Sequence, residues 1–301
     1  MHHTEELPII SIALCTYNGE KYLEEQLDSL VNQTYPNIEI IAVDDCSHDS
    51  TLSILKAYSA KHKNLSIYTN TTNLGYSKNF EKSVSLCKGE YISISDQDDI
   101  WNLDKLSVLY EHIGDNLLIY AKSKIINSQG EQTGQSSMDK SVPYFGNDPR
   151  VNILINFIWG HFVMFKKELI PLTFPLPEKV SYDWFLGVVA LNYGRIKYLD
   201  RALVHHRRHE ESATSIFRKN RKKNDKPHML RHLLRGIVTL DNLKYESFFR
   251  EMYALFEKDS FFTKIRLFFF LIKYRNVLLY VSKKGMLSKL NYLRQVAFRQ
   301  M

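Results

Sequence analysis

The sequence predicts an α/β fold in which a mostly parallel sheet is flanked by helices. Two observations predict it. Short apolar runs alternate with segments of helical periodicity over the first hundred residues, and polar residues follow the end of each run. Such alternation is typical of parallel sheets covered by helices on both faces. Because ligands bind beyond the carboxyl ends of parallel strands, we expect these polar residues to meet in one crevice.

The elements of this first part are read from the period of the apolar residues, which is about two in a strand and 3.6 in a helix. We expect strands at residues 8–14, 38–43, 65–68 and 90–95, separated by helices at about 23–31, 50–58 and 80–87.

After residue 100 the pattern is more mixed. Residues 127–150, rich in Ser, Gln, Gly and Asp, show little periodicity and are predicted to form a mobile loop. The other expected elements are helices at 103–113 and 182–193 and strands at 117–126, 159–165 and 196–205.

Charge divides the chain near residue 215. Residues 1–216 carry 20 Lys and Arg against 27 Asp and Glu, a net −7, whereas residues 217–301 carry 20 against 6, a net +14. We therefore expect an α/β domain at 1–215, with halves at 8–100 and 101–215, and a basic helical extension at 216–301. A basic extension predicts an anionic partner, either a membrane or nucleic acid.

Composition and motifs exclude several classes of protein. Three scattered cysteines provide neither a disulfide framework nor a metal cluster, which indicates a reducing compartment. No secretory signal is expected at the start. The chain also lacks a P-loop, a GxGxxG dinucleotide fingerprint and an HExxH zinc motif.

An acidic turn closes the fourth predicted strand. Asp96, Asp98 and Asp99 occupy three of four consecutive positions. Carboxylates that close repel one another, and burying them costs several kcal/mol unless a cation compensates. Either solvent surrounds this turn, or it binds Mg²⁺ or Mn²⁺, which are usually held by one or two carboxylates and the phosphates of a nucleotide.

Two segments resemble a known family. The stretch SIALCTYNGEKYLEEQLDSLVNQTYPNIEIIAVDDCSHDST, followed by SDQDD, is similar to family 2 glycosyltransferases of the GT-A fold. The resemblance covers residues 8 to about 210. It points most closely to the bacterial enzymes of polysaccharide synthesis, including rhamnosyltransferases of O-antigen and capsule.

The resemblance implies roles for the donor-side residues. Asp96-Gln97-Asp98 stands as the DxD motif, in which Asp98 would ligate a cation that bridges the donor diphosphate and Asp96 would contact the ribose or sugar. Tyr17 would stack on the base, and Asp45 would accept a hydrogen bond from N3–H of uracil or thymine. The other expected nucleotide-sugar-binding residues are Cys15, Asn18, Asn73, Gly75 and Gln97.

Asp183 stands where the family has its catalytic base. Such a carboxylate deprotonates the acceptor hydroxyl as it attacks the anomeric carbon with inversion. From the pattern alone, Asp183 would instead be a first-turn residue that stabilises the helix dipole. Many relatives have Glu or His before this Asp, where this chain has Tyr182, so how the base is activated is left open.

The resemblance implies further contacts in the second half. In the segment HHRRH at 205–209, His209 would complete the metal shell and Arg207 would contact a phosphate, the alternative being a solvated basic strand end. The segment Trp159-Gly160-His161 lies where relatives have acceptor-pocket residues, so His161 is expected on the acceptor side, and Trp184 is expected to stack on a sugar ring. Both tryptophans could equally belong to the core.

The tail contains the segment FFTKIRLFFFLIKYRNVLLYV at 261–281, which is apolar but interrupted by four cations. A spanning helix needs about 20 mostly uncharged residues. The mixture instead predicts a helix in the membrane interface, with Phe268, Phe269 and Leu271 immersed. The alternative is a packed helical subdomain with a basic, solvated face.

We therefore predict an inverting glycosyltransferase that depends on Mn²⁺ or Mg²⁺. It would move a sugar from dTDP-rhamnose or a UDP-hexose to a glycan acceptor carried on a lipid, at the cytoplasmic face of the cell membrane. Two alternatives remain open: a non-catalytic sugar-nucleotide or nucleic-acid binding protein, and a nucleotidyltransferase. The latter usually needs a glycine- and lysine-rich triphosphate loop, and the tail has no nucleic-acid motif, so no nucleic-acid partner is expected.

Overall fold

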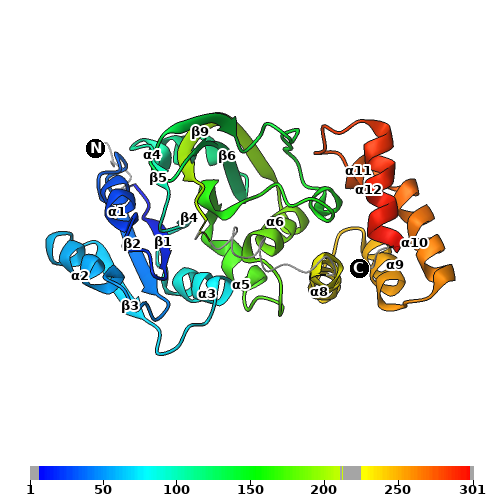
Figure 1. Ribbon diagram of the computed structural model, residues 1–301, viewed down its shortest axis with the longest axis horizontal. Coiled ribbons are helices and arrows are strands. Elements are labelled where there is room, and N and C mark those ends of the chain that lie inside the picture. The colour runs from blue at the N-terminus through cyan, green and yellow to red at the C-terminus, as the bar shows by residue number, and fades with distance from the viewer. Residues whose placement is uncertain (1–6, 211, 213–224, 299–301) are drawn as a thin grey trace, which may run out of the picture.

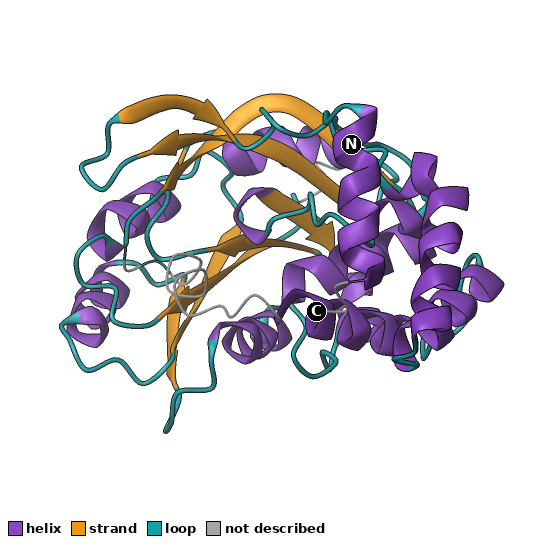
Figure 2. Cartoon of the chain, turned by 45° about the vertical axis from the view of Figure 1, so that its right-hand side comes forward, coloured by secondary structure: helices purple, strands orange, loops and turns teal. Residues whose placement is uncertain are grey.

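The protein is described by a computed structural model over residues 7–210, 212 and 225–298 (Figure 1). Within these ranges, nine strands form one sheet in the order β3-β2-β1-β4-β8-β6-β9-β5, with β7 paired to β6. Figure 2 shows helices on both sides of this sheet. The predicted α/β fold is confirmed.

The first half of the sheet is parallel, as expected from its apolar strands, which are covered by helices. The strand β1 (Ile10–Thr16) lies between β2 (Ile38–Asp44) and β4 (Tyr91–Ser95), and β3 (Leu65–Thr69) pairs with β2. Their carboxyl ends therefore meet at one edge. The connecting helices are α1 (Leu23–Val31), α2 (Thr51–Lys61) and α3 (Tyr76–Leu86).

The second half is mixed. The strand β8 (Val163–Lys166) runs antiparallel to β4 and to β6 (Leu118–Ile126), and the long strand β9 (Ile196–Arg207) runs parallel to β6. A two-residue strand, β5 (Ile100–Trp101), pairs with β9 directly after the acidic turn. The strand β9 thus delivers its last residues to that turn. The helices of this half are α4 (Lys105–Ile113), α5 (Ile170–Thr173) and α6 (Tyr182–Tyr193).

The loop predicted at 127–150 is wrong in part. Residues Gln132–Ser136 form β7, which pairs antiparallel with β6. Its sequence QTGQS has no apolar residue, and four of its five residues are exposed, so the alternation that marks a strand is missing. The predicted strand at 159–165 is also later than expected, because Gly160–Phe162 form a short 3-10 helix before β8 begins.

The predicted helical extension is present and lies at one end of the molecule (Figure 1). It shares the core of the sheet domain: Tyr193 Oη donates to Asp241 O at 2.7 Å, and Tyr292 Oη donates to Leu154 O at 2.7 Å. The boundary predicted near residue 215 lies outside the described residues. The extension consists of α8 (Asp225–Ile237), α9 (Glu246–Glu257), α10 (Phe261–Lys273), α11 (Arg275–Leu278) and α12 (Met286–Phe298).

The alternative of a packed subdomain is thus correct for part of the tail. Leu271 is fully buried, and Phe268 packs its ring 5.8 Å from that of Phe298, so neither is freely available for immersion, whereas Phe269 is exposed. Over the ranges given above, no helix combines the length and hydrophobicity needed to cross a bilayer.

Candidate active site

The loops after β2 and β3 are joined by the buried carboxylate of Asp45. Its Oδ1 accepts hydrogen bonds from Asn70 Nδ2 at 2.7 Å and Leu74 N at 2.8 Å, and its Oδ2 accepts from Gly75 N at 2.9 Å. Gly75 has a φ of +80°, which a residue with a side chain rarely adopts, and Asn73 Oδ1 also accepts from its N–H at 3.0 Å. Asp45 therefore fixes the shape of this loop. To accept a hydrogen bond from a nucleotide base as well, its carboxylate would have to use a lone pair that these three protein donors leave free.

The loop after β1 is held by Gln97. Tyr17 N donates to Gln97 Oε1 at 2.7 Å, and Gln97 Nε2 donates back to Tyr17 O at 3.0 Å. The Asn18 side chain accepts from His48 N at 2.9 Å, with a φ of +45° at Asn18 itself. These amides position the loop, while the Tyr17 ring, on a residue 43 % exposed, is available to a planar ligand. Cys15 lies buried in β1, and burial raises the pKa of its thiol well above the usual value.

The acidic turn brings Asp96 and Asp98 to the same edge. The half-buried Asp96 carboxylate has no hydrogen-bond partner among the described residues; its burial and the charges of Asp99 and Asp98 raise its pKa well above the usual value. Asp98 Oδ2 lies 2.8 Å from His209 Nε2. Carboxylates and an imidazole are ligand types that suit Mn²⁺ or Mg²⁺, and the uncompensated charge of Asp96 favours a cation near this edge. Within the described residues, however, the potential ligand atoms that lie within 4.8 Å of one another are those of Asp99, His161 and His206.

Asp99, by contrast, is fully buried, so the alternative of a solvated turn does not hold at this residue. Its Oδ1 accepts from Arg207 N at 3.0 Å and lies 2.9 Å from His206 Nδ1, whereas its Oδ2 has no partner within the described ranges. Burial alone would lower the pKa of His206, but the Asp99, Asp98 and Asp96 carboxylates raise it above the usual value. The buried carboxylate is thus paired with an imidazole that has a raised pKa.

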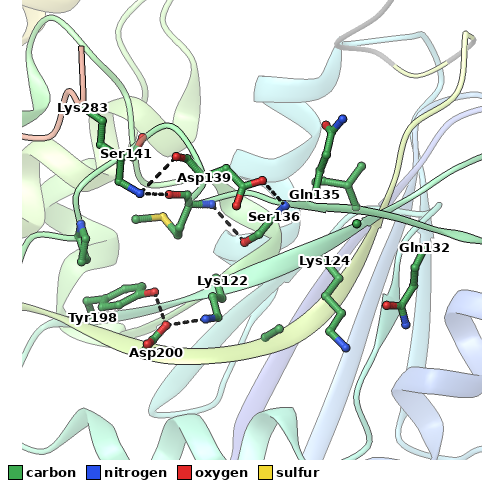
Figure 3. A pocket seen from close by; sticks show the side chains of 15 residues that line it. Lys122, Lys124, Gln132, Gln135, Ser136, Asp139, Ser141, Tyr198, Asp200 and Lys283 are labelled. Atoms are coloured by element: carbon green, nitrogen blue, oxygen red, sulfur yellow. Dashed lines mark hydrogen bonds and ion pairs between the residues drawn. The ribbon is translucent and has the colours of Figure 1, made fainter. Parts of the chain in front are cut away.

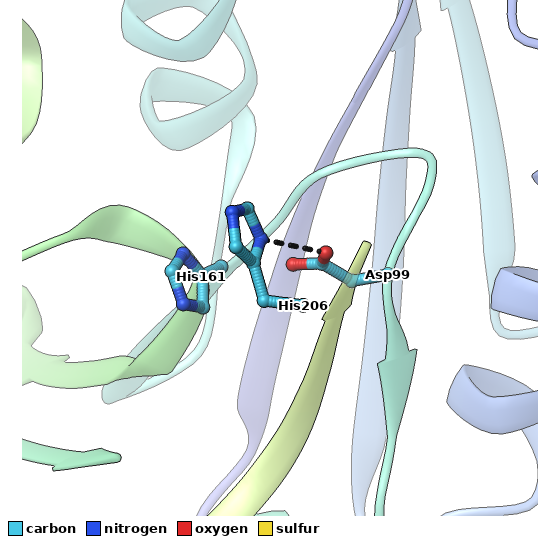
Figure 4. Close-up of side chains that lie close together, drawn as sticks. All are labelled: Asp99, His161 and His206. Carbon is cyan, nitrogen blue, oxygen red and sulfur yellow. Dashed lines mark hydrogen bonds and ion pairs between the residues drawn. The ribbon is translucent and has the colours of Figure 1, made fainter. Parts of the chain in front are cut away.

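The His206 ring stacks on His161 from the segment before β8, with centroids 4.3 Å apart and planes 5° from parallel (Figure 4). His161 is buried, and its Nε2 lies 3.0 Å from Ser123 Oγ. Burial and the neighbouring His206 lower its pKa well below the usual value. Because the rings are parallel, their in-plane lone pairs do not converge on a common ion. His161 is therefore buried beside the His206–Asp99 pair, and its acceptor-side role stays a prediction.

Arg207 is buried and bonded to protein groups. Its Nε donates to Asp98 O at 3.0 Å, one terminal nitrogen donates to Glu25 Oε2 at 2.5 Å, and its guanidinium lies 4.6 Å from the centre of the Tyr22 ring. These contacts fix the acidic turn to α1. The expected phosphate contact would require these contacts to open, and it stays a prediction.

Asp183 opens α6, as its place in the sequence suggests. Its Oδ1 accepts from Ser181 Oγ and, at 2.7 Å, from Trp184 N, and burial raises its pKa above the usual value. Its negative charge contributes to the raised pKa of Asp96. Tyr182 is buried against Phe80, with ring centroids 4.4 Å apart.

Trp184 is half-buried, and its Nε1 donates to Asn152 O at 2.5 Å.

One ionisable residue beneath the site was not predicted from the sequence. Lys105 is fully buried on α4, and its Nζ donates to His161 O at 2.8 Å and lies 3.0 Å from the centre of the Trp101 ring. Burial lowers the pKa of Lys105 well below the usual value, against the opposing effect of Asp99 and Asp96. Its sequence signal is weak: Lys105 stands three and four residues before the apolar Val108 and Leu109, on the same face of α4.

A cavity of about 610 Å³ lies away from this edge, between the outer side of β6 and β9 and the chain around Lys283 (Figure 3). Lys122 pairs there with Asp200 at 2.6 Å, and Lys283 Nζ donates to Met138 O and Asp139 O. The cavity contains none of the predicted donor-binding residues, so it is separate from the crevice.

Comparisons with known proteins agree with this geometry. Residues 11–172 match the family described as glycosyl transferase family 2. A poly(ribitol-phosphate) β-glucosyltransferase of Bacillus spizizenii is 34 % identical over 180 residues, which are 58 % of this chain and 28 % of that enzyme. The chain spans less than a third of the length of the first curated relatives that it matches.

Two solved structures share the fold. S. aureus TarS in complex with UDP-GlcNAc superimposes with a TM-score of 0.63 at 22 % identity, covering 98 % of this chain and 92 % of that one. The Pyrobaculum calidifontis mannosyltransferase PcManGT, with GDP-Man and Mn²⁺, gives 0.57 at 15 % identity, covering 98 % and 88 %. Because the family match extends over more than half of the sequence and the architecture agrees, the chain belongs to glycosyl transferase family 2, with a GT-A fold.

Proposed function

We propose that the chain transfers a sugar from a pyrimidine nucleoside-diphosphate sugar to a glycan hydroxyl with inversion, and that Asp183 is the base. The observation that carries this proposal is the position of Asp183: a half-buried carboxylate in the first turn of α6, held by Ser181 and Trp184, with a pKa above the usual value. A raised pKa brings a carboxylate closer to the value at which general-base catalysis is efficient near neutral pH. The Ser181 and Trp184 hydrogen bonds fix its orientation.

Asp96, Asp98 and His209 would hold Mn²⁺ or Mg²⁺. A bound divalent cation supplies electrophilic stabilisation of the diphosphate that leaves. Around it, the residues of this chain keep the carboxylates in place: Arg207 ties the backbone of Asp98 to Glu25, and Asp99 anchors the end of β9. The Mn²⁺ complex of the P. calidifontis mannosyltransferase supports this assignment.

The donor would lie over the loops after β1, β2 and β3. Tyr17 would stack on the base, Asp45 would accept its N3–H, and the backbone from Asn73 to Gly75 would line the nucleotide. UDP-GlcNAc bound to S. aureus TarS and the glucosyl transfer of the B. spizizenii enzyme favour a UDP-hexose, with dTDP-rhamnose the second candidate.

The acceptor would be a bacterial surface polymer or its lipid-linked precursor, with Trp184 beside the incoming sugar. The poly(ribitol-phosphate) substrate of the B. spizizenii relative supports a polymer of this class. Residues 8–210 would contain the whole transferase site, and residues 216–301 would form a basic helical extension of that domain.

A donor screen tests the proposal. The full chain is incubated with Mn²⁺ and, separately, UDP-glucose, UDP-GlcNAc, dTDP-rhamnose and GDP-mannose, and release of the nucleoside diphosphate is measured. We expect hydrolysis of a UDP- or dTDP-sugar that EDTA stops. Preference for GDP-mannose would contradict the proposed recognition of a pyrimidine by Tyr17 and Asp45. Binding without any turnover would favour a non-catalytic sugar-nucleotide binding protein.

A further inference from the structure

The helix α10 exposes an apolar and cationic stripe, which we call the α10 stripe: Phe262, Arg266, Phe269 and Lys273. Their spacing of four, three and four residues places them along one side of the helix. Phe262 is 78 % exposed and Phe269 is 64 % exposed. Two large aromatic side chains on one exposed helix side are unusual for a surface that meets only water.

The stripe is not the side on which α10 packs. Leu267, Phe270 and Leu271 are buried in the core of the extension, so the helix has a complete inward face without the stripe. The aromatic surface also continues onto α12: Phe268 lies 6.0 Å from Phe269 and 5.8 Å from the 37 % exposed Phe298, measured between ring centroids. The half-buried ring of Phe268 thus connects the exposed Phe269 of α10 with the exposed Phe298 of α12.

The charge around these rings is of one sign. Residues 260–301 contain nine Lys and Arg and no Asp or Glu. Lys264 pairs with Asp259 at 2.6 Å, whereas Arg266 and Lys273 form no ion pair with any part of the chain that the structure describes. The cations that flank the exposed phenylalanines are thus free to meet an external anion.

We propose that the α10 stripe and Phe298 dock the protein on an anionic lipid bilayer, with α10 in the plane of the interface. Aromatic side chains that enter the acyl boundary and cations at the level of the headgroups are the two contributions that hold an interfacial helix. A second copy of the chain fits less well, because two surfaces without carboxylates would bring like charges together. This inference goes beyond the proposed reaction and does not depend on it.

Sedimentation of the full chain with vesicles tests the proposal, since removing residues 216–301 would expose the shared core. Phosphatidylglycerol-containing vesicles are compared with phosphatidylcholine alone, at low and high salt. We expect binding to the anionic vesicles that salt weakens. The variant Arg266→Gln/Lys273→Gln should bind about 25-fold more weakly, from about five-fold per cation. The variant Phe262→Ser/Phe269→Ser should lose at least about ten-fold per phenylalanine.

Two matched controls lie outside α10 and α12. Phe145→Ser removes another exposed ring (71 %), and Lys56→Gln/Lys61→Gln removes two exposed cations from α2 at the opposite end of the molecule. Both controls should bind vesicles as the wild type does, and the stripe variants should keep the melting temperature of the wild type. Equal binding by stripe and control variants would overturn the proposal. So would an absence of vesicle binding at low salt, or a dimer that the stripe variants dissociate without any vesicle binding.

Discussion

The two halves of the sheet assemble their parts of the site in different ways. At the parallel edge, Tyr17, Asp45 and Asp96 each follow a strand of β1, β2 or β4 directly, so the topology brings them together. In the mixed half, Asp99 meets His206 from 107 positions away, and His161 stacks on that histidine from a third segment. The parallel edge is thus specified locally, whereas the buried cluster depends on the course of β9.

The two regions also differ in how their charges are compensated. The Asp45 carboxylate accepts three hydrogen bonds from the protein, and Asp99 is paired with His206. Asp96, between them, has no such partner among the described residues, and its pKa is raised. Compensated carboxylates hold the shape of the crevice, and the uncompensated one is left for a ligand. Substitutions of carboxylates that shape the crevice and of carboxylates that would bind a ligand should therefore have different effects on stability and on activity.

The largest effect is expected for Asp98→Ala, which removes a carboxylate from the cation site. We expect transfer and donor hydrolysis to become undetectable at any Mn²⁺ concentration. The melting temperature should change little, because the loss of the His209 contact is offset by relief of the repulsion between Asp98 and Asp96. Activity assays and calorimetric titration of Mn²⁺ measure this. Asp104→Ala, which removes only a surface pair with Arg201, is the control. Full turnover in excess EDTA would contradict a metal-dependent mechanism.

Asp183→Asn should be the next most severe change. Removing a positioned base typically costs about 10²–10⁴-fold in rate, so kcat should fall by this factor while UDP and Mn²⁺ still bind. In the wild type, kcat should decline as the pH falls through the raised pKa of Asp183, because the base must be deprotonated. Ser181→Ala removes a hydrogen bond that lowers this pKa and should move the decline to higher pH. A variant with near wild-type kcat would show that another group is the base.

The same raised pKa has a consequence for stability. A carboxyl group with a higher pKa in the folded than in the unfolded state favours folding as the pH falls through the folded value, and its charged form opposes folding above it. At neutral pH, Asp183→Asn should therefore raise the melting temperature, and the gain should shrink toward acidic pH. Thermal unfolding of both proteins from neutral to acidic pH measures the difference. A variant less stable than the wild type at neutral pH would contradict the direction of the pKa shift.

The parts of the fold and the site that could be predicted from the sequence are those that depend on residues close together in the chain. The period of the apolar residues is a local property of the sequence, and it predicted the parallel strands. Because ligands bind beyond the carboxyl ends of parallel strands, these strands in turn predicted the crevice and its loops. The partners of Gln97, Arg207 and His161 were not predicted, because each depends on a contact between distant segments. The strand β7 was missed because it has no apolar residue. Lys105 was overlooked because its burial is visible only once α4 packs against the segment of His161.

Asp99→Ala should have an intermediate effect, mainly on stability. It leaves the N–H of Arg207 and the ring of His206 without their acceptor, and a buried unsatisfied group costs about 1–3 kcal/mol. We expect a lower melting temperature and a weaker Mn²⁺ site, because the end of β9 no longer holds His209 opposite Asp98. A double-mutant cycle with His206→Gln measures the coupling between the pair. Additive effects of the two changes would mean that the pair does not act as a unit.

The smallest effect is expected for Gln97→Ala, which removes the two hydrogen bonds that hold the backbone of Tyr17. Neutral hydrogen bonds contribute about 0.5–1.5 kcal/mol each, and less where solvent competes, so the KM for the donor should rise by at most about ten-fold with kcat little changed. Tyr17→Ala should raise it by a similar or larger factor, since stacking on a base contributes about 1–3 kcal/mol. Gln129→Ala, an exposed glutamine in the β6–β7 turn, is the control. If Gln97→Ala lowers kcat as strongly as Asp183→Asn does, Gln97 acts on the reacting groups themselves, and the parallel edge is not the passive donor support that its hydrogen bonds indicate.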